Sequence, residues 1–202
     1  MKEYFTINKN KFFRQFIQTS ILLTIIWTII ILTDKKGMNF ETKLFGYLLF
    51  ALPLTFLVQL VINIGEAIEF KRTKKILSNG QFNELLSFGF HKTFTDKKSK
   101  WLSSQPMFVG QVDKYPVKLK VEKRVVRVIA GADLDLIEKS HMKELKNIFG
   151  KDNVEYDIGI ALLFRPSRYK NLIFQDFYFE LKQFISFLKI NKINPWDENG
   201  NA

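Results

Sequence analysis

Cysteine and histidine, which often act as nucleophiles, bases and metal ligands, are scarce in this chain. It has no cysteine and two histidines, His91 and His141. Without cysteine there is no thiol nucleophile, disulfide or cysteine-based zinc site. Zinc-binding helices place two histidines four residues apart with a glutamate beside the first, and the sequence around His141 lacks this pattern. We therefore expect His141 to be a partly buried structural residue, and we predict no metal ion and no cofactor.

Acidic and glycine residues near position 133 also have structural explanations. Asp133 and Asp135 flank the start of a predicted helix, where carboxylates interact favourably with the helix dipole. Gly110 and Gly131 are isolated, so neither a phosphate-binding loop nor a dinucleotide motif is formed. The sequence therefore predicts no catalytic residues, although an enzyme without these signatures stays open as an alternative.

Basic residues gather on the strands expected between residues 106 and 130. Two of them, Lys118 and Lys120, share the polar face of one strand. The others occupy the adjoining turns and the next strand, and they are Lys114, Lys123, Arg124 and Arg127. The whole set is a candidate anion-facing patch, and a solvated polar face is the simpler alternative. Aromatic residues fall on the apolar side of these strands, which disfavours nucleic acid as a partner.

A second basic group, Lys71, Arg72, Lys74 and Lys75, follows an apolar stretch closely. Basic residues at the cytoplasmic surface of a membrane are attracted to anionic lipid headgroups, by about 1 kcal/mol each. The same residues can act as a signal for membrane topology. Both roles are compatible, and this juxtamembrane group makes anionic lipid an expected partner.

Two charge-free stretches near the N-terminus explain why that group matters. They cover residues 15–33 and 44–65, and each is about as long as a helix that crosses a bilayer. A cleaved signal peptide is the alternative for the first stretch, but its apolar region is too long and no small-residue cleavage site follows. We expect an uncleaved hairpin of two transmembrane helices.

The basic flanks predict the orientation of this hairpin. Residues 1–14 and the basic linker helix expected at 66–80 carry more lysine and arginine than the loop at 34–43. Basic residues accumulate on the cytoplasmic side of a membrane. Both termini are therefore expected in the cytoplasm, at an inner or plasma membrane, with the loop outside.

Polar residues recur every fourth position in both expected spans. Ser20, Thr24 and Thr28 form one stripe, and Thr55, Gln59 and Asn63 form the other. In an antiparallel hairpin Thr24 lies near the depth of Thr55, and Ser20 near that of Gln59. The stripes are expected to hold the hairpin together, with self-association between chains and a polar pore as alternatives. Pro53 should kink or loosen the second span.

Residues 81–202 are expected to form a cytoplasmic α+β domain, an antiparallel sheet packed by helices. Strands are predicted at 106–112, 117–122 and 125–130 as a meander, and one long strand over 156–164. The amphipathic helices are expected at 133–149, with Asp133 as N-cap and a buried stripe that includes His141 and Ile148, and at 172–190. Shorter features precede these, namely a left-handed cap at Ser78-Asn79-Gly80, a helix over 81–87, an extended stretch over 90–95 and a polar turn at 97–100.

The composition limits the function without naming it. Most of the net charge of +11 lies after the second span. The leading hypothesis is a membrane protein whose cytoplasmic domain is not an enzyme and binds or recruits a partner protein at the inner membrane face. A self-assembling complex or small channel subunit is the second hypothesis, and a membrane-tethered enzyme is the third.

Overall fold

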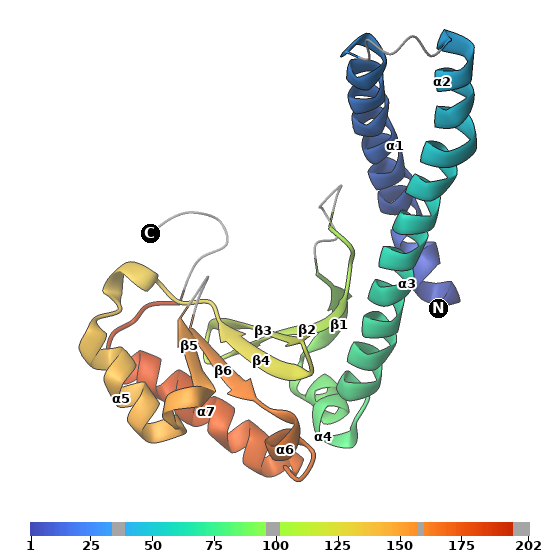
Figure 1. The fold of residues 1–202 in the computed structure, drawn as a ribbon. Helices are drawn as coiled ribbons and strands as arrows, with labels where there is room; N and C mark the ends of the chain where they lie inside the picture. Colours follow the sequence, from blue (N-terminus) through green and yellow to red (C-terminus); the bar gives the residue numbers. More distant parts are fainter. Residues whose placement is uncertain (34–38, 96–101, 157–159, 196–202) are drawn as a thin grey trace. The chain divides into compact units, whose positions relative to one another are not determined.

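The computed structural model describes residues 1–33, 39–95, 102–156 and 160–195, and the side chains of all of these except Phe40 and Leu134 (Figure 1). The chain divides into two compact units. The first comprises residues 1–71 with 96–104, and the second comprises residues 72–95 with 105–202. The turn expected at 97–100 lies outside the described residues.

Two long helices build the first unit. The helix α1 spans Lys2–Thr33. The second runs through α2 (Phe40–Gly46), a π turn (Tyr47–Ala51) and α3 (Leu52–Leu77). Both are long and apolar enough to cross a membrane, and they contain the two charge-free stretches predicted from the sequence. Figure 1 shows α1 beside α2 and the first part of α3 as an antiparallel pair.

The π turn accounts for the irregularity expected at Pro53. The backbone N–H of Leu52 bonds to the carbonyl oxygen of Tyr47, five residues back. Proline has no N–H, and its ring crowds the carbonyl of the residue four positions before it. Just before Pro53 the helix therefore has hydrogen bonds that span five residues instead of four, which confirms the predicted loosening.

An antiparallel sheet of six strands forms the centre of the second unit. Its strands, in chain order, are β1 (His91–Phe94), β2 (Pro106–Val112), β3 (Tyr115–Glu122), β4 (Val125–Ala130), β5 (Val154–Tyr156) and β6 (Ile160–Phe164). In space the order is β1-β2-β3-β4-β6-β5. The structure confirms the α+β class, the antiparallel sheet and the meander from β2 to β4.

Both turns of the meander use left-handed backbone conformations. Asp113 and Lys114 have φ angles of 46° and 74°, and Lys123 and Arg124 have φ angles of 47° and 68°. Two consecutive positive φ angles match the right-handed twist of the strands that the turn connects. Tyr115 and Pro116, which lie between the strands predicted at 106–112 and 117–122, begin β3 and pair with β2.

Helices cover one face of this sheet. They are α4 (Gly80–Asn83) with a 3-10 turn (Glu84–Phe88), α5 (Lys139–Phe149), α6 (Pro166–Tyr169) and α7 (Phe174–Ile190). Figure 1 shows α5 and α7 on the same side of the strands. Val117, Leu119 and Val121 of β3 are buried and alternate with more exposed polar residues, as predicted. The helix α7 is amphipathic, as predicted, and its buried residues include Phe177, Leu181 and Leu188.

The helix predicted from Asp133 begins later than expected. Asp133 precedes a 3-10 turn over Leu134–Leu136, and its Oδ1 accepts the N–H of Asp135 at 3.1 Å. Glu138 is the true N-cap of α5, in a capping box with His141. Asp133 therefore caps a short turn that ends before the helix starts. Ile148 is 53% exposed rather than buried.

The long strand predicted over residues 156–164 is instead a hairpin. Strands β5 and β6 pair antiparallel, with Val154 opposite Leu162 and Tyr156 opposite Ile160. In both strands apolar or aromatic residues occupy the even-numbered positions, so the sequence alternates as it would in one continuous strand. Residues 157–159, which connect them, lie outside the described part of the chain.

The end of α3 differs from the prediction in its cap. The helix ends at Leu77 as expected, but Gly80 begins α4, and Asn79 is extended (φ −62°, ψ 148°). Asn79 thus stands before a new helix instead of closing the previous one. A left-handed glycine does occur at Gly89, with a φ angle of 82°, after the 3-10 turn that leads into β1.

Candidate functional site

Polar side chains, most of them buried, gather at one end of the helix pair in the first unit. We call these residues the polar cluster: Tyr4, Asn8 and Lys11 of α1, Asn63 and Glu66 of α3, and Ser103 and Ser104. Residues 4, 8 and 11 lie on one face of α1, since residues three and four apart are neighbours on a helix. Most members are almost completely buried, with exposed fractions from 0% for Tyr4 to 9% for Lys11.

The carboxylate of Glu66 is the centre of one half of the polar cluster. The hydroxyl of Tyr4 donates to Glu66 Oε2 at 2.6 Å, and Asn63 Oδ1 lies 3.2 Å from the same hydroxyl. Ser103 Oγ also donates to Glu66 Oε2. Hydrogen bonds to an ionised acceptor are stronger than those between neutral groups. Glu66 therefore holds both α1 and Ser103 against α3.

Ser104 is the centre of the other half. Its backbone N–H donates to Asn8 Oδ1 at 2.8 Å, and its carbonyl oxygen accepts from Asn8 Nδ2 at 3.4 Å. Lys11 Nζ donates to Ser104 Oγ at 2.7 Å. The amide of Asn8 thus replaces the pairing that a neighbouring strand would give. These bonds hold residues 103–104 of the segment between β1 and β2 against the helix pair.

Burial also changes the acidity of Tyr4, which precedes the charge-free stretch of α1. Removal from water, followed by the hydrogen bond to Glu66, raises the pKa of the Tyr4 hydroxyl well above its ordinary value. A phenolate beside a carboxylate would place two negative charges in a site with little water. Tyr4 therefore stays a neutral donor, which suits a structural hydrogen bond better than proton transfer.

The two predicted polar stripes face the seam between the helices only in part. Thr55, Gln59 and Asn63 are buried, with exposed fractions of 5%, 9% and 1%. Gln59 Nε2 donates to Thr19 Oγ1 at 2.9 Å, so its partner is the residue before the expected Ser20. Asn63 belongs to the polar cluster and reaches Tyr4 rather than a residue of the first stripe.

Tyr47 takes the place that we expected Thr55 to hold opposite Thr24. The hydroxyls of Thr24 and Tyr47 are hydrogen bonded to each other, whereas Thr55 bonds back to the carbonyl of Ala51. Trp27 Nε1 donates to the carbonyl of Lys43 at 3.0 Å. Of the first stripe, Ser20 has a buried Oγ with no hydrogen-bond partner among the described residues. Thr28 bonds to the carbonyl of Thr24 within its own helix.

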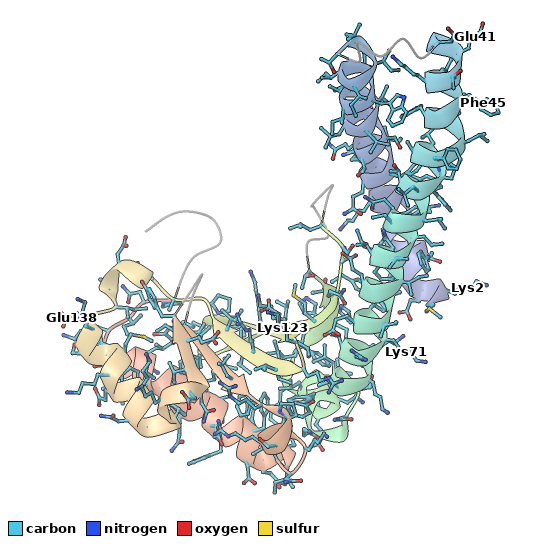
Figure 2. All side chains as sticks on the ribbon, in the orientation of Figure 1. Lys2, Glu41, Phe45, Lys71, Lys123 and Glu138 are labelled. Carbon is cyan, nitrogen blue, oxygen red and sulfur yellow. The ribbon has the colours of Figure 1, made fainter. Side chains whose placement is uncertain are left out.

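The juxtamembrane basic group lies on the last turns of α3. Lys71, Arg72, Lys74 and Lys75 are all exposed, and Lys74 and Lys75 occupy the last turn. Cations there interact favourably with the helix dipole. Figure 2 shows the side chain of Lys71 extending away from the axis of α3.

The basic residues of the sheet do not form one patch. Lys114 lies in the turn before β3, whereas Lys123 (labelled in Figure 2) and Arg124 lie in the turn after it. These turns stand at opposite ends of a strand of eight residues, about 25 Å apart. Arg124 instead opposes the rise that burial causes in the pKa of Tyr169.

The remaining three, Lys118, Lys120 and Arg127, share the face of the sheet opposite the helices. Lys120 Nζ lies 2.6 Å from Glu122 Oε1, and Arg127 bridges Glu122 and Glu155 at 3.2 and 2.8 Å. Lys118 also has an interaction within the chain. The charges on these strands therefore largely satisfy one another, which favours the solvated polar face over an anion-binding surface.

Sequence reasoning missed most of the polar cluster. Its available signal was the 4–8–11 spacing of Tyr4, Asn8 and Lys11 in a segment that was treated only as a charged flank. Ser103 and Ser104 had no such signal. Asn8 and Lys11, which bond to Ser104, lie more than 90 positions before it in the sequence. Among the described residues, no three histidine or acidic side chains are grouped so that they could hold a metal ion.

Comparison with known proteins does not extend this description. No known family, curated protein or solved structure matches the chain.

Proposed function

We propose that this is an integral membrane protein anchored by a helical hairpin, whose α+β unit binds a partner at the inner membrane face. Residues 15–33 of α1 are the first span, and residues 44–65 of the helix formed by α2, the π turn and α3 are the second. Both termini lie in the cytoplasm, and the loop at 34–43 lies outside.

The observation that carries the proposal is the exposed apolar surface of both helices. Of the 18 most apolar consecutive residues in each helix, 0% are buried within the chain in α1 and 17% in the second helix. Large side chains are half exposed or more, among them Ile21, Leu22, Ile25, Leu57 and Val61. Soluble monomers rarely leave such a large continuous apolar surface in water. A bilayer would cover it.

The polar cluster supports an uncleaved anchor over a signal sequence. A signal sequence near the N-terminus also passes the test of length and hydropathy. Cleavage after α1 would remove Tyr4, Asn8 and Lys11, however. Ser104 would then lose its bonds to Asn8 and Lys11, and Glu66 would lose its bond to Tyr4. Unpaired buried polar groups are costly, so retention of α1 fits the packing better.

A reporter that is active only outside the cytoplasm tests this proposal. We expect no activity when it is fused after Ala202 and high activity when it is inserted at Gly37. The protein should also stay in the membrane pellet after an alkaline carbonate wash, and its intact mass should include α1. Activity at Ala202 without activity at Gly37 would contradict the orientation, and release by carbonate would contradict the anchor.

The binding role rests on the charge of the second unit. In its two stretches, residues 72–95 and 105–202, this unit has 20 lysine and arginine residues against 14 aspartate and glutamate residues. A net positive unit beside an anionic membrane surface attracts acidic partners and lipids. Purification in mild detergent should retain a bound partner at low salt and lose it at high salt, because ionic screening weakens such contacts.

A further inference from the structure

Lysine residues line a hollow in the second unit, away from the polar cluster and from the basic residues of the sheet. The hollow lies between α5 and β5 and has a volume of about 620 Å³. This volume is within the range of pockets that hold small organic ligands, about 300–1,000 Å³. Nine residues line it, and they are Ile137, Glu138, Lys139, Met142, Lys143, Lys146, Asn147, Lys151 and Tyr156. We call it the lysine hollow.

Among the described residues, the lining of the lysine hollow carries an excess of positive charge. Four of the lining residues are lysines, and none of them has an ion pair within the described part of the chain. The single carboxylate in the lining belongs to Glu138, which caps α5 and accepts from Ser140 Oγ at 3.0 Å. Lys118, Lys120 and Arg127 on the sheet, in contrast, all have interactions within the chain.

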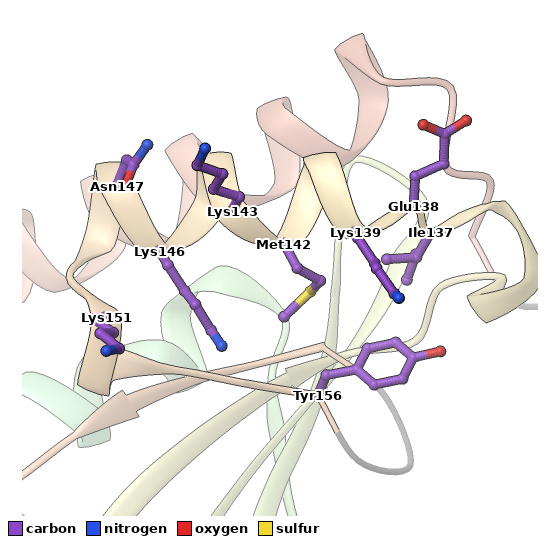
Figure 3. Close-up of a pocket in the computed structure, with 9 residues that line it drawn as sticks. All are labelled: Ile137, Glu138, Lys139, Met142, Lys143, Lys146, Asn147, Lys151 and Tyr156. Carbon is purple, nitrogen blue, oxygen red and sulfur yellow. The ribbon is translucent and has the colours of Figure 1, made fainter.

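The arrangement of the side chains follows from the helix period. Lys139, Met142 and Lys146 are three and four residues apart, so they lie on one face of α5. Figure 3 shows all three extending from α5 toward β5, with Tyr156 on the opposite side of the hollow. A thioether thus lies between two ammonium groups and opposite a phenol ring.

This combination fits a ligand with two chemically different parts. Ammonium groups bind phosphate oxygens through charge-assisted hydrogen bonds. Met142, Ile137 and the half-exposed ring of Tyr156 offer polarizable and apolar surface, on which a flat ring can pack. Inorganic phosphate would use only the lysines. A nucleic acid strand would extend beyond a hollow that fits a single small molecule.

We propose that the lysine hollow binds a soluble organic phosphate in which a phosphate group is joined to an aromatic ring, the class that includes mononucleotides. Lys139, Lys146 and Lys151 hold the phosphate, and Met142 and Tyr156 contact the ring. The proposal stands on the second unit alone and does not depend on the membrane anchor.

Binding of ATP to the full chain in a non-ionic detergent, measured by calorimetry, tests the proposal. We expect saturable binding of one ATP per chain. Lys139→Gln with Lys146→Gln should weaken it by about tenfold or more, because two charge-assisted contacts are lost. The matched control, Lys170→Gln with Lys189→Gln, removes two exposed lysines outside the hollow and should keep the affinity within about twofold.

A second variant separates the ring from the phosphate. Tyr156→Leu should weaken ATP binding but leave binding of inorganic phosphate unchanged. No saturable ATP binding, or equal losses in the hollow and control variants, would overturn the proposal. A loss in the Lys139/Lys146 variant seen only for nanodiscs with phosphatidylglycerol, and not for ATP, would overturn it in favour of a lipid headgroup site. Thermal unfolding of each variant checks that it is folded.

Discussion

At the scale of single residues, Glu66 is the acceptor on which half of the polar cluster depends. Glu66→Ala leaves the buried Tyr4 hydroxyl and Ser103 without their charged partner. Each such loss costs about 1–3 kcal/mol, so we expect a clear fall in the melting temperature of the full protein in detergent. Glu41→Ala, which removes an exposed carboxylate from α2, is the control and should change it little. Equal effects would show that the polar cluster does not stabilise the fold.

Tyr115 makes the second unit sensitive to alkaline pH. Its hydroxyl donates to the carbonyl oxygen of Ile193 at 2.6 Å, and burial raises its pKa above the ordinary value of 10.0. The folded chain therefore keeps this proton at a pH where the unfolded chain has lost it. The stabilisation is complete below about pH 10 and is lost as the pH rises through the raised pKa.

Unfolding by denaturant between pH 9 and 11.5 measures this effect. The loss of stability with pH should be shallower for Tyr115→Phe than for the native chain. It should be shallower still when Tyr169 is also changed to Phe, because burial raises the pKa of Tyr169 too. An unchanged slope in both variants would contradict the role of these hydroxyls.

At the scale of elements, the turn between β2 and β3 carries avoidable strain. Lys114 has a φ angle of 74°, and a left-handed conformation costs an L-residue about 1–2 kcal/mol. Asp-Gly is a preferred pair for such turns. Lys114→Gly should therefore stabilise the second unit against denaturant by about 0.5–1 kcal/mol. Lys118→Gly within β3 is the control and should destabilise it, since glycine weakens a strand.

The pairing of the two long helices is a second prediction at this scale. Thr19 and Gln59 are hydrogen bonded in the structure, and the chain has no native cysteine. Cysteines at these two positions should be joined within one chain by a short thiol cross-linker. Thr28→Cys with Gln59→Cys is the control, because Thr28 lies about 14 Å farther along α1. Cross-links formed only between chains would favour a self-assembled complex.

The elements also show what the sequence can and cannot predict. Period and turn residues located α7, the meander and both long helices, because those signals are local. Asp133 misled the prediction of α5, since it caps a separate turn. The pair β5–β6 was taken for one strand because both strands share one alternation phase. The spacing of Tyr4, Asn8 and Lys11 was a local sign of the polar cluster, but the contacts of Asn8 and Lys11 with Ser104 join residues far apart in sequence, which no local pattern reveals.

At the scale of the whole molecule, the juxtamembrane group should determine how the chain lies in the membrane. Eight basic residues flank the two spans on the proposed cytoplasmic side. Four lie within residues 1–14, and the other four are Lys71, Arg72, Lys74 and Lys75. The loop at 34–43 has three, namely Lys35, Lys36 and Lys43. We expect this excess of five to orient the hairpin, since short flanks near the spans dominate topology.

Changing Lys71, Arg72, Lys74 and Lys75 together to Gln reduces that excess from five to one. The full chain should then insert in both orientations, so a reporter fused after Ala202 should gain activity outside the cytoplasm in part of the molecules. The control changes Lys170, Lys182, Lys189 and Lys192 to Gln, which removes the same charge more than 90 residues beyond the second span. It should keep the native orientation, because distant charges contribute little to topology. A uniform native orientation in both variants would restrict the juxtamembrane group to a role at the lipid surface, which binding to vesicles with and without anionic lipid would then measure.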